Sequence, residues 1–102
     1  MSRVRLADRS VLVLTSLAGG DRHGYALMKD IKSFSGVALS PGTLYGALSK
    51  LEADGFVERL PANDRRHPYT LTAAGRAALA ERLAESARIA SLGLERIALG
   101  RS

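Results

Sequence analysis

The chain lacks cysteine and tryptophan altogether, and its aromatic residues are three tyrosines and two phenylalanines. Without cysteine it has no disulfide framework, thiolate metal site or cysteine nucleophile, a composition that fits a reducing, intracellular setting. Apolar runs such as Val11–Leu14 fall far short of the ~20 residues that a membrane-spanning helix needs. The basic start Met1–Leu6 is not followed by the apolar block of a secretion signal. We therefore expect a cytoplasmic protein without a membrane partner.

Metal-binding and catalytic clusters are missing from the sequence as well. The two histidines, His23 and His67, are not accompanied by carboxylates at metal-ligand spacing. No acid or nucleophile stands beside His23 in the sequence, so we expect this residue to start a helix or to pack rather than to act as a catalyst. The sequence therefore predicts no metal, no cofactor and no enzymatic activity.

What the chain does have is an excess of positive charge on a length that suits one domain. Its 102 residues are 46% hydrophobic, which is enough for a single core. Fifteen Lys and Arg against ten Asp and Glu give a formal net charge of +5. This balance favours an anionic partner without identifying it.

Two helices are predicted in the first third of the chain. Asp8 is expected to cap a helix over Arg9–Ala18, whose nearly continuous apolar sequence indicates burial on more than one side. The paired glycines in Gly19-Gly20-Asp21 end it. A second helix is expected over His23–Phe34, before a stop at Ser35-Gly36. The charged residues of this second helix, expected to face solvent, are Lys29, Asp30 and Lys32.

A third helix has the clearest start in the chain. Ser40-Pro41 places a capping serine before a proline at the first helical position, where a missing N–H costs nothing. Gly55 is placed to close the helix, which therefore spans about 41–54. Its apolar stripe at spacing i, i+4, i+7 consists of Leu44, Leu48 and Leu51.

The remaining sequence predicts a hairpin and a long final helix. Two strand-like segments, Phe56–Leu60 and Pro68–Thr72, flank a loop with a basic tip. Thr72 can cap a helix over Ala73–Leu99, which is too long to pack wholly on so small a body. Apolar positions that fall in one narrow arc of this helix are Leu79, Leu83, Ala87, Ala90, Leu94 and Ile97.

This order of elements predicts a mainly α fold with a small β-hairpin. We interpret it as a winged helix-turn-helix with a long C-terminal dimerisation helix. Residues 1–72 would form the DNA-binding domain and residues 73–102 the dimerisation helix, together in one compact unit. Fold alone does not fix function, so the specific motifs must supply it.

Three stretches of sequence carry that more specific signal. They are His23-Gly24-Tyr25, then Ser40-Pro41-Gly42-Thr43-Leu44-Tyr45, then Tyr69-Thr70-Leu71-Thr72-Ala73-Ala74-Gly75. Together they resemble the PadR family of bacterial transcriptional regulators, and the resemblance extends from Leu6 to Leu83. It implies a homodimer that binds double-stranded DNA in a sequence-specific manner, most often as a repressor, and that senses effectors near the dimer interface.

The third helix and the hairpin tip are the predicted DNA surface. With its leucines facing inward, the helix turns a face of small side chains outward, which can sit deep in a major groove while the helix N-terminus takes a phosphate. Thr43 and Ser49 can reach base edges, and Lys50 can reach a phosphate. The two arginines at the tip can neutralise phosphate or enter the minor groove. The predicted DNA-binding residues are Ser40, Gly42, Thr43, Tyr45, Gly46, Ser49, Lys50, Arg65 and Arg66.

Five of these nine assignments have a structural alternative. Gly42 and Gly46 could relieve crowding against the second helix instead of admitting DNA. Tyr45 lies at the edge of the apolar stripe, so it could be half core with only its hydroxyl presented to the DNA backbone. Arg65 and Arg66 could belong to an ordinary solvated loop.

The uncovered arc of the final helix predicts a two-fold dimer. The nearly apolar first helix is the expected second element of the interface. The alternative is a lone amphipathic helix that folds back on its own core. At the level of function, the alternative is a winged-helix protein-interaction module without sequence-specific DNA binding. The predicted interface residues are Leu12, Leu79, Leu83, Ala87, Ala90, Leu94 and Ile97.

Overall fold

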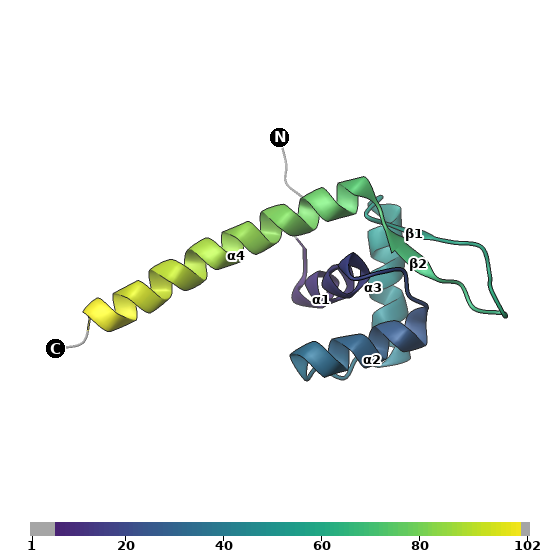
Figure 1. Ribbon diagram of the computed structural model, residues 1–102, viewed down its shortest axis with the longest axis horizontal. Helices are drawn as coiled ribbons and strands as arrows, with labels where there is room; N and C mark the ends of the chain where they lie inside the picture. The colour runs from purple at the N-terminus through teal and green to yellow at the C-terminus, as the bar shows by residue number, and fades with distance from the viewer. Residues whose placement is uncertain (1–5, 101–102) are drawn as a thin grey trace.

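The structure is a computed structural model that describes residues 6–100. Three helices are followed by a two-stranded antiparallel hairpin and one long helix (Figure 1). This order confirms the predicted mainly α fold with a small hairpin. The elements are α1 (Asp8–Ala18), α2 (Gly24–Ser35), α3 (Pro41–Ala53), β1 (Val57–Arg59), β2 (Tyr69–Leu71) and α4 (Ala73–Leu99).

Helices α3 and α4 begin at the predicted capping residues. The Ser40 hydroxyl accepts a hydrogen bond from the amide of Thr43 at 3.2 Å, and the Thr72 hydroxyl accepts one from the amide of Gly75 at 3.0 Å. Pro41 occupies the first turn of α3, where its missing N–H leaves no intrahelical bond unmade. Both starts are therefore determined by local sequence.

The start of α1 differs from the prediction. Asp8 is the first residue of the helix rather than its cap, Ala7 stands at the cap position, and no side chain caps the helix. The prediction that Asp8 caps α1 was wrong. Its carboxylate instead supplies negative charge in the first turn, where the helix dipole favours it, and lies 3.5 Å from the guanidinium of Arg82 on α4.

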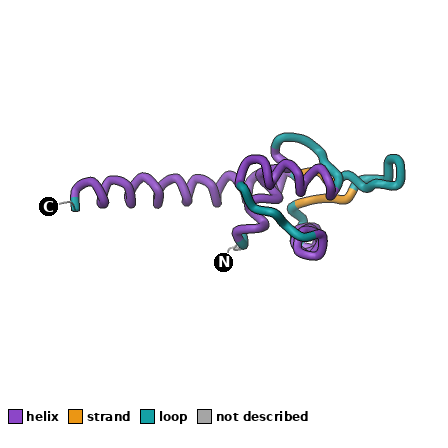
Figure 2. The backbone as a smooth tube through the Cα atoms, turned by 90° about the horizontal axis from the view of Figure 1, so that it is seen from below, coloured by secondary structure: helices purple, strands orange, loops and turns teal. Residues whose placement is uncertain are grey.

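The core lies where α1, α2 and α3 meet at one end of the molecule (Figure 2). The predicted inner stripe of α3 is confirmed, because Leu44, Leu48 and Leu51 are at most 1% exposed. The three helices thereby turn the opposite side of α3 outward. The other core residues are Val13, Leu14, Leu17, Leu27, Ile31, Ala47, Val57, Tyr69 and Leu79.

The predicted hairpin is confirmed, with strands shorter than the predicted segments. Val57 pairs with Leu71 and Arg59 pairs with Tyr69 in an antiparallel ladder. Beyond Arg59 the pairing continues through the bond from the Leu60 amide to the Pro68 carbonyl at 2.8 Å and through an isolated bridge between Asn63 and Arg66. We call residues 57–71 the wing. Its loop extends beyond the helical body on the side away from the end of α4 (Figure 1).

An isolated antiparallel β-bridge, which the sequence did not predict, joins the wing to the segment before α2. The Arg22 amide donates to the Tyr69 carbonyl at 3.1 Å, and the Tyr69 amide donates to the Arg22 carbonyl at 2.8 Å. Burial raises the pKa of the Tyr69 phenol, and the neighbouring Arg59 guanidinium opposes this shift. The phenol is therefore neutral near pH 7, as a buried side chain should be.

Helix α4 leaves the body and gives the molecule an elongated shape, 60 × 34 × 21 Å along its principal axes (Figure 2). Its first turns pack on the body, and Leu79 is 5% exposed within the core of its own chain. Leu79, predicted as a dimer contact, therefore has little surface left for a partner. None of the helices in residues 6–100 has both the length and the apolar character needed to cross a membrane.

Candidate nucleic-acid interface

The outward side of α3 gathers most of the predicted DNA-binding residues. Ser40, Gly42, Gly46, Ser49 and Lys50 are exposed, while Thr43 is half-buried. We call the exposed small residues Gly42, Gly46, Ser49 and Ala53 the open face of α3. The Ser40 hydroxyl also donates to the Thr43 hydroxyl at 3.0 Å, so the start of the helix is held by polar contacts from both side chains.

The two glycines of the open face are not there to relieve crowding. A Cβ added to Gly42 or to Gly46 would meet no atom within 4 Å. The interpretation that they make room for α2 was therefore wrong. A glycine inside a helix costs ~1 kcal/mol relative to alanine, so an external reason for them, such as close approach of a ligand, gains support.

Tyr45 is a predicted DNA-binding residue, and the alternative was that it is half core with only its hydroxyl toward DNA; in the structure that hydroxyl lies toward α2. The side chain is 46% exposed, and the end of its ring lies against Gly24, the first residue of α2. A Cβ at Gly24 would overlap the Tyr45 hydroxyl. Tyr45 therefore joins α3 to the start of α2, and the glycine of the His23-Gly24-Tyr25 motif is explained by this contact.

Gly24→Ala should therefore reduce the free energy of unfolding by about 1 kcal/mol, the lower end of the range for overpacking, because the end of the Tyr45 ring can move. In a Tyr45→Ala background the same substitution should cost nothing, since the ring that it would meet is gone. Urea denaturation of the four proteins of this double-mutant cycle measures the coupling. Equal costs in both backgrounds would contradict the contact.

The two arginines at the wing tip, predicted as a pair, occupy unlike positions. Asp64 and Arg65 form the corner of the tip turn with φ of 52° and 65°, a conformation that two-residue hairpin turns need and that usually selects Asn or Gly. Arg65 is thereby held exposed at the outer corner. Arg66 instead reaches back to α2, with Nη1 3.1 Å from Nε2 of His23.

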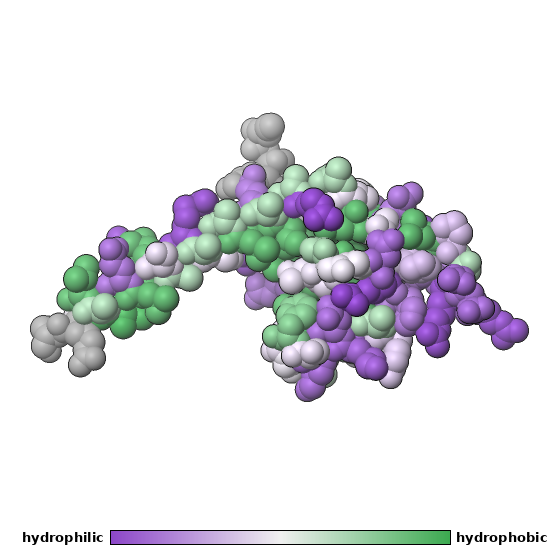
Figure 3. Space-filling model, in the orientation of Figure 1, coloured by the Kyte–Doolittle hydropathy of each residue, from purple (hydrophilic) through white to green (hydrophobic). Residues whose placement is uncertain are grey.

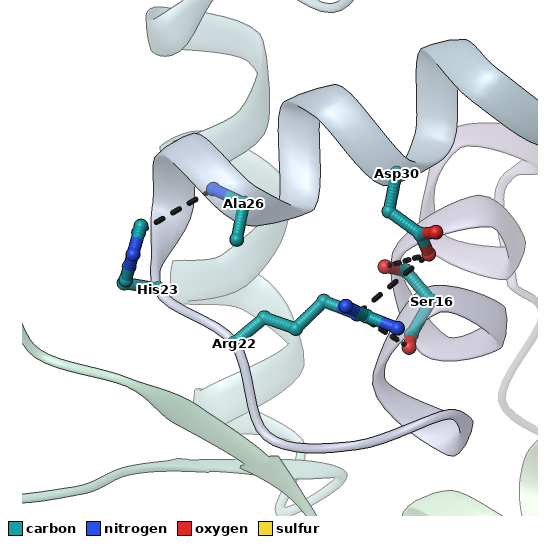
Figure 4. Close-up of polar contacts among 5 residues, drawn as sticks. All are labelled: Ser16, Arg22, His23, Ala26 and Asp30. Carbon is teal, nitrogen blue, oxygen red and sulfur yellow. Dashed lines mark hydrogen bonds and ion pairs between the residues drawn. The ribbon is translucent and has the colours of Figure 1, made fainter.

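A cluster of polar side chains joins α2 to α1 (Figure 4). The Ser16 hydroxyl donates to Asp30 at 2.6 Å, Arg22 Nε donates to the Ser16 carbonyl at 3.2 Å, and Arg22 Nε lies 3.7 Å from the Asp30 carboxylate. The expectation that Asp30 faces solvent was wrong, since it is half-buried. Sequence reasoning missed this cluster because its members are 6–14 residues apart on different elements.

The free part of α4 exposes a broad apolar surface, visible at its far end in Figure 3. Leu94 and Ile97 are 69% and 68% exposed, in agreement with an uncovered stripe. The alternative in which α4 folds back on its own core was wrong for this part of the helix. The prediction also missed apolar residues that lie outside the arc, on the other side of the helix. These additional exposed residues are Ile89, Leu92 and Leu99.

The described residues were predicted to hold no metal site, and His23 was predicted to start a helix or to pack. Within residues 6–100, no group of three or more His, Cys, Asp or Glu lies close enough to hold a metal ion. His23 is the cap of α2, where its Nδ1 accepts from the Ala26 amide at 3.4 Å (Figure 4). The expectation that His23 starts a helix is confirmed.

The chain matches known proteins over most of its length. The sequence pattern of the family described as "Transcriptional regulator PadR-like family" matches residues 13–81. The Transcriptional regulator Rv3488 of Mycobacterium tuberculosis is 42% identical over 72 residues, which cover 68% of this chain and 66% of that protein. An uncharacterized 37.1 kDa protein in transposon TN4556 of Streptomyces fradiae is 44% identical over 86 residues, which cover 84% of this chain and 25% of that protein. The chain thus spans only a quarter of the Streptomyces protein.

Solved structures share the fold over most of the chain. The crystal structure of a PadR family transcription regulator from Clostridium difficile R20291 matches with a TM-score of 0.78 at 25% identity, covering 86% of this chain and 96% of that chain. A transcriptional regulator from Clostridium thermocellum matches with a TM-score of 0.74 at 22% identity, covering 90% of this chain and 97% of that chain. The second likeness concerns the fold alone.

Proposed function

The chain belongs to the PadR-like family of transcriptional regulators, and from this premise we propose that it represses transcription by binding an inverted-repeat operator in double-stranded DNA as a homodimer. It is a regulator and not an enzyme. The observation that carries the proposal is the open face of α3, where no contact within residues 6–100 crowds Gly42 or Gly46 and the small side chains leave the helix free to enter a major groove.

With α3 in a major groove, the residues around its open face become further proposed DNA contacts. At the N-terminus of α3 the Gly42 amide and the helix dipole suit a phosphate, since Pro41 has no N–H and the Thr43 amide donates to the Ser40 cap. Ser49 and Thr43 are the proposed contacts to base edges, and Lys50 is a proposed phosphate contact, released from its ion pair with Asp54 at 3.4 Å. Ser40, Gly42, Tyr45 and Gly46 complete the proposed surface along the helix.

We propose that α4 forms the dimer together with α1. The apolar arc beyond Leu83 is too exposed for a free helix in water, and a two-fold partner would cover it. Leu12 on α1 is partly buried on its own core and would add contact area. The proposed α4 contacts are Leu83, Ala87, Ala90, Leu94 and Ile97. A small-molecule effector would bind at this same apolar interface.

Selection of bound fragments from genomic DNA tests the proposal directly. We expect an enriched inverted repeat whose half-sites lie about 10 bp or about 20 bp apart, because a two-fold dimer presents two copies of α3 to one side of the duplex. Weak binding that is insensitive to salt and sequence would contradict it and would favour a protein-interaction module.

Arg65→Ala should lower the affinity for all DNA sequences alike. If each protomer places one Arg65 on a phosphate, the slope of log K against log salt should fall by about 2 for a dimer. Fluorescence anisotropy over a salt series measures this slope. Arg88→Ala, which removes the same charge from the exposed side of α4, is the matched control and should leave the slope unchanged. Equal slopes for Arg65→Ala and the parent would leave the tip as a solvated loop.

A further inference from the structure

The wing loop is held in shape by hydrogen bonds within itself. At its tip, Asn63 and Arg66 exchange two backbone hydrogen bonds of 2.7 and 3.0 Å. Nearer the base, the His67 ring lies 3.0 Å from the Leu60 carbonyl through Nδ1, and the Leu60 amide donates to the Pro68 carbonyl at 2.8 Å. These contacts hold the shape of the loop but say nothing of its angle to the helices.

That angle is set by contacts between the wing and the segment that leads into α2. Two of them lie at the base of the wing, where Tyr69 pairs with Arg22 and the Thr70 hydroxyl donates to the Asp21 carboxylate at 2.6 Å. A third lies farther out, where Arg66 Nη1 is 3.1 Å from His23 Nε2 across 43 residues of sequence. A loop held only at its base can pivot, and a contact nearer the tip prevents this.

His23 is an unusual residue for its other role, the cap of α2. Helix caps favour Ser, Thr, Asp and Asn, and this chain uses Ser40 and Thr72 at its other side-chain caps. A neutral imidazole has one acceptor nitrogen, so it serves either the Ala26 amide at 3.4 Å or the Arg66 guanidinium at 3.1 Å at one time. The shorter distance belongs to Arg66. Capping alone therefore does not explain a histidine here.

We infer that His23 and Arg66 form a latch that fixes the wing relative to α2 and α3, and that Arg66 is a positioning residue rather than a DNA contact. The inference rests on the proposed function, because the wing must be placed for DNA. It divides the two tip arginines by role. Arg65, at the exposed corner of the turn, is the phosphate contact, and Arg66 holds the wing at the angle that brings Arg65 to the duplex.

Two substitutions of His23 separate the latch from the cap. His23→Ser keeps a good capping oxygen but has no atom that reaches Arg66. His23→Gln is a poor cap, yet its side-chain oxygen can occupy the place of Nε2 and accept from Arg66. If His23 serves only as a cap, His23→Ser should bind DNA more tightly than His23→Gln. If His23 is part of a latch, His23→Gln should bind more tightly.

The measurements are operator affinity, its salt slope, and hydrogen–deuterium exchange of the wing amides without DNA. We expect His23→Ser and Arg66→Ala each to weaken binding about three- to tenfold, the range for one hydrogen bond. The salt slope should not change, because the freed wing still brings Arg65 to its phosphate in the complex and only the cost of ordering the wing is added. The double variant should bind no worse than Arg66→Ala. His23→Gln should bind as the parent does. Hydrogen–deuterium exchange over residues 61–68 should be faster than in the parent in His23→Ser and in Arg66→Ala, and unchanged in Arg65→Ala.

Parent-like binding and wing exchange in His23→Ser would overturn the latch. So would a loss in salt slope for Arg66→Ala equal to that of Arg65→Ala, since Arg66 would then be a phosphate contact. If the parent protein binds no DNA sequence, the proposed function fails. The exchange measurement still decides the latch in that case, because it needs no DNA.

Discussion

Replacing Leu83 and Leu94 together with aspartate should convert the dimer to monomers and lower operator affinity by about 10²–10⁴-fold. Leu94 is 69% exposed and Leu83 is 43% exposed in the single chain, so neither substitution disrupts a buried site within the protomer. In a dimer both side chains would be desolvated, and an unpaired buried carboxylate is strongly unfavourable. Affinity falls because two linked half-site contacts gain from effective concentration, which a monomer lacks.

Sedimentation velocity gives the oligomeric state, and anisotropy with an operator duplex gives the affinity. The matched control is Ala84→Asp with Ser91→Asp, which adds the same charge to the same helix. Both control positions are exposed, and at 100° per residue they fall outside the apolar arc. The control should remain dimeric. A Leu83→Asp, Leu94→Asp protein that stays dimeric would place the interface elsewhere on the chain.

The elements of this fold could be predicted from sequence where short-range contacts determine them. The caps of α3 and α4 each join a hydroxyl to an amide three residues along, and the leucine stripe of α3 repeats within one helix. Asp8 gave an equally good local signal at α1, yet its position is one residue inside the helix, where it lies near Arg82 of α4. Local preference marks a helix end only to within a residue or two.

The parts of the candidate site that the sequence could not predict depend on contacts across the fold. Arg66 meets His23 across 43 residues, and Arg22 pairs with Tyr69 to add a strand partner to the wing. The need for glycine at position 24 could not be predicted either, because it comes from contact with Tyr45 on another helix. A pattern such as His23-Gly24-Tyr25 can indicate a family. The contacts that each of its residues makes can be known only from the arrangement of α2, α3 and the wing in the folded chain.

Direct reading of bases by α3 should be visible in three alanine variants. Ser49 lies on the open face and Thr43 is half-buried beside it, both away from the leucine core. Thr43→Ala and Ser49→Ala should therefore change stability little, but each should cost about 1–3 kcal/mol of binding free energy at the preferred site and relax the base preference there. Lys50→Ala should instead weaken specific and scrambled duplexes alike, as the loss of a phosphate contact does.

The comparison of specific with scrambled DNA is what separates base reading from general attraction. Footprinting locates the half-sites, and anisotropy with both duplexes gives the ratio of affinities for each variant. Ala53→Ser, which adds a hydroxyl to the far end of the open face, is a control for a small polar change on the same helix and should leave the preference at the Ser49 position intact. The serine and threonine variants should lower the ratio while the lysine variant preserves it. If Thr43→Ala and Ser49→Ala bind both duplexes as the parent does, α3 is not the reader, and its open face would instead suit a protein partner.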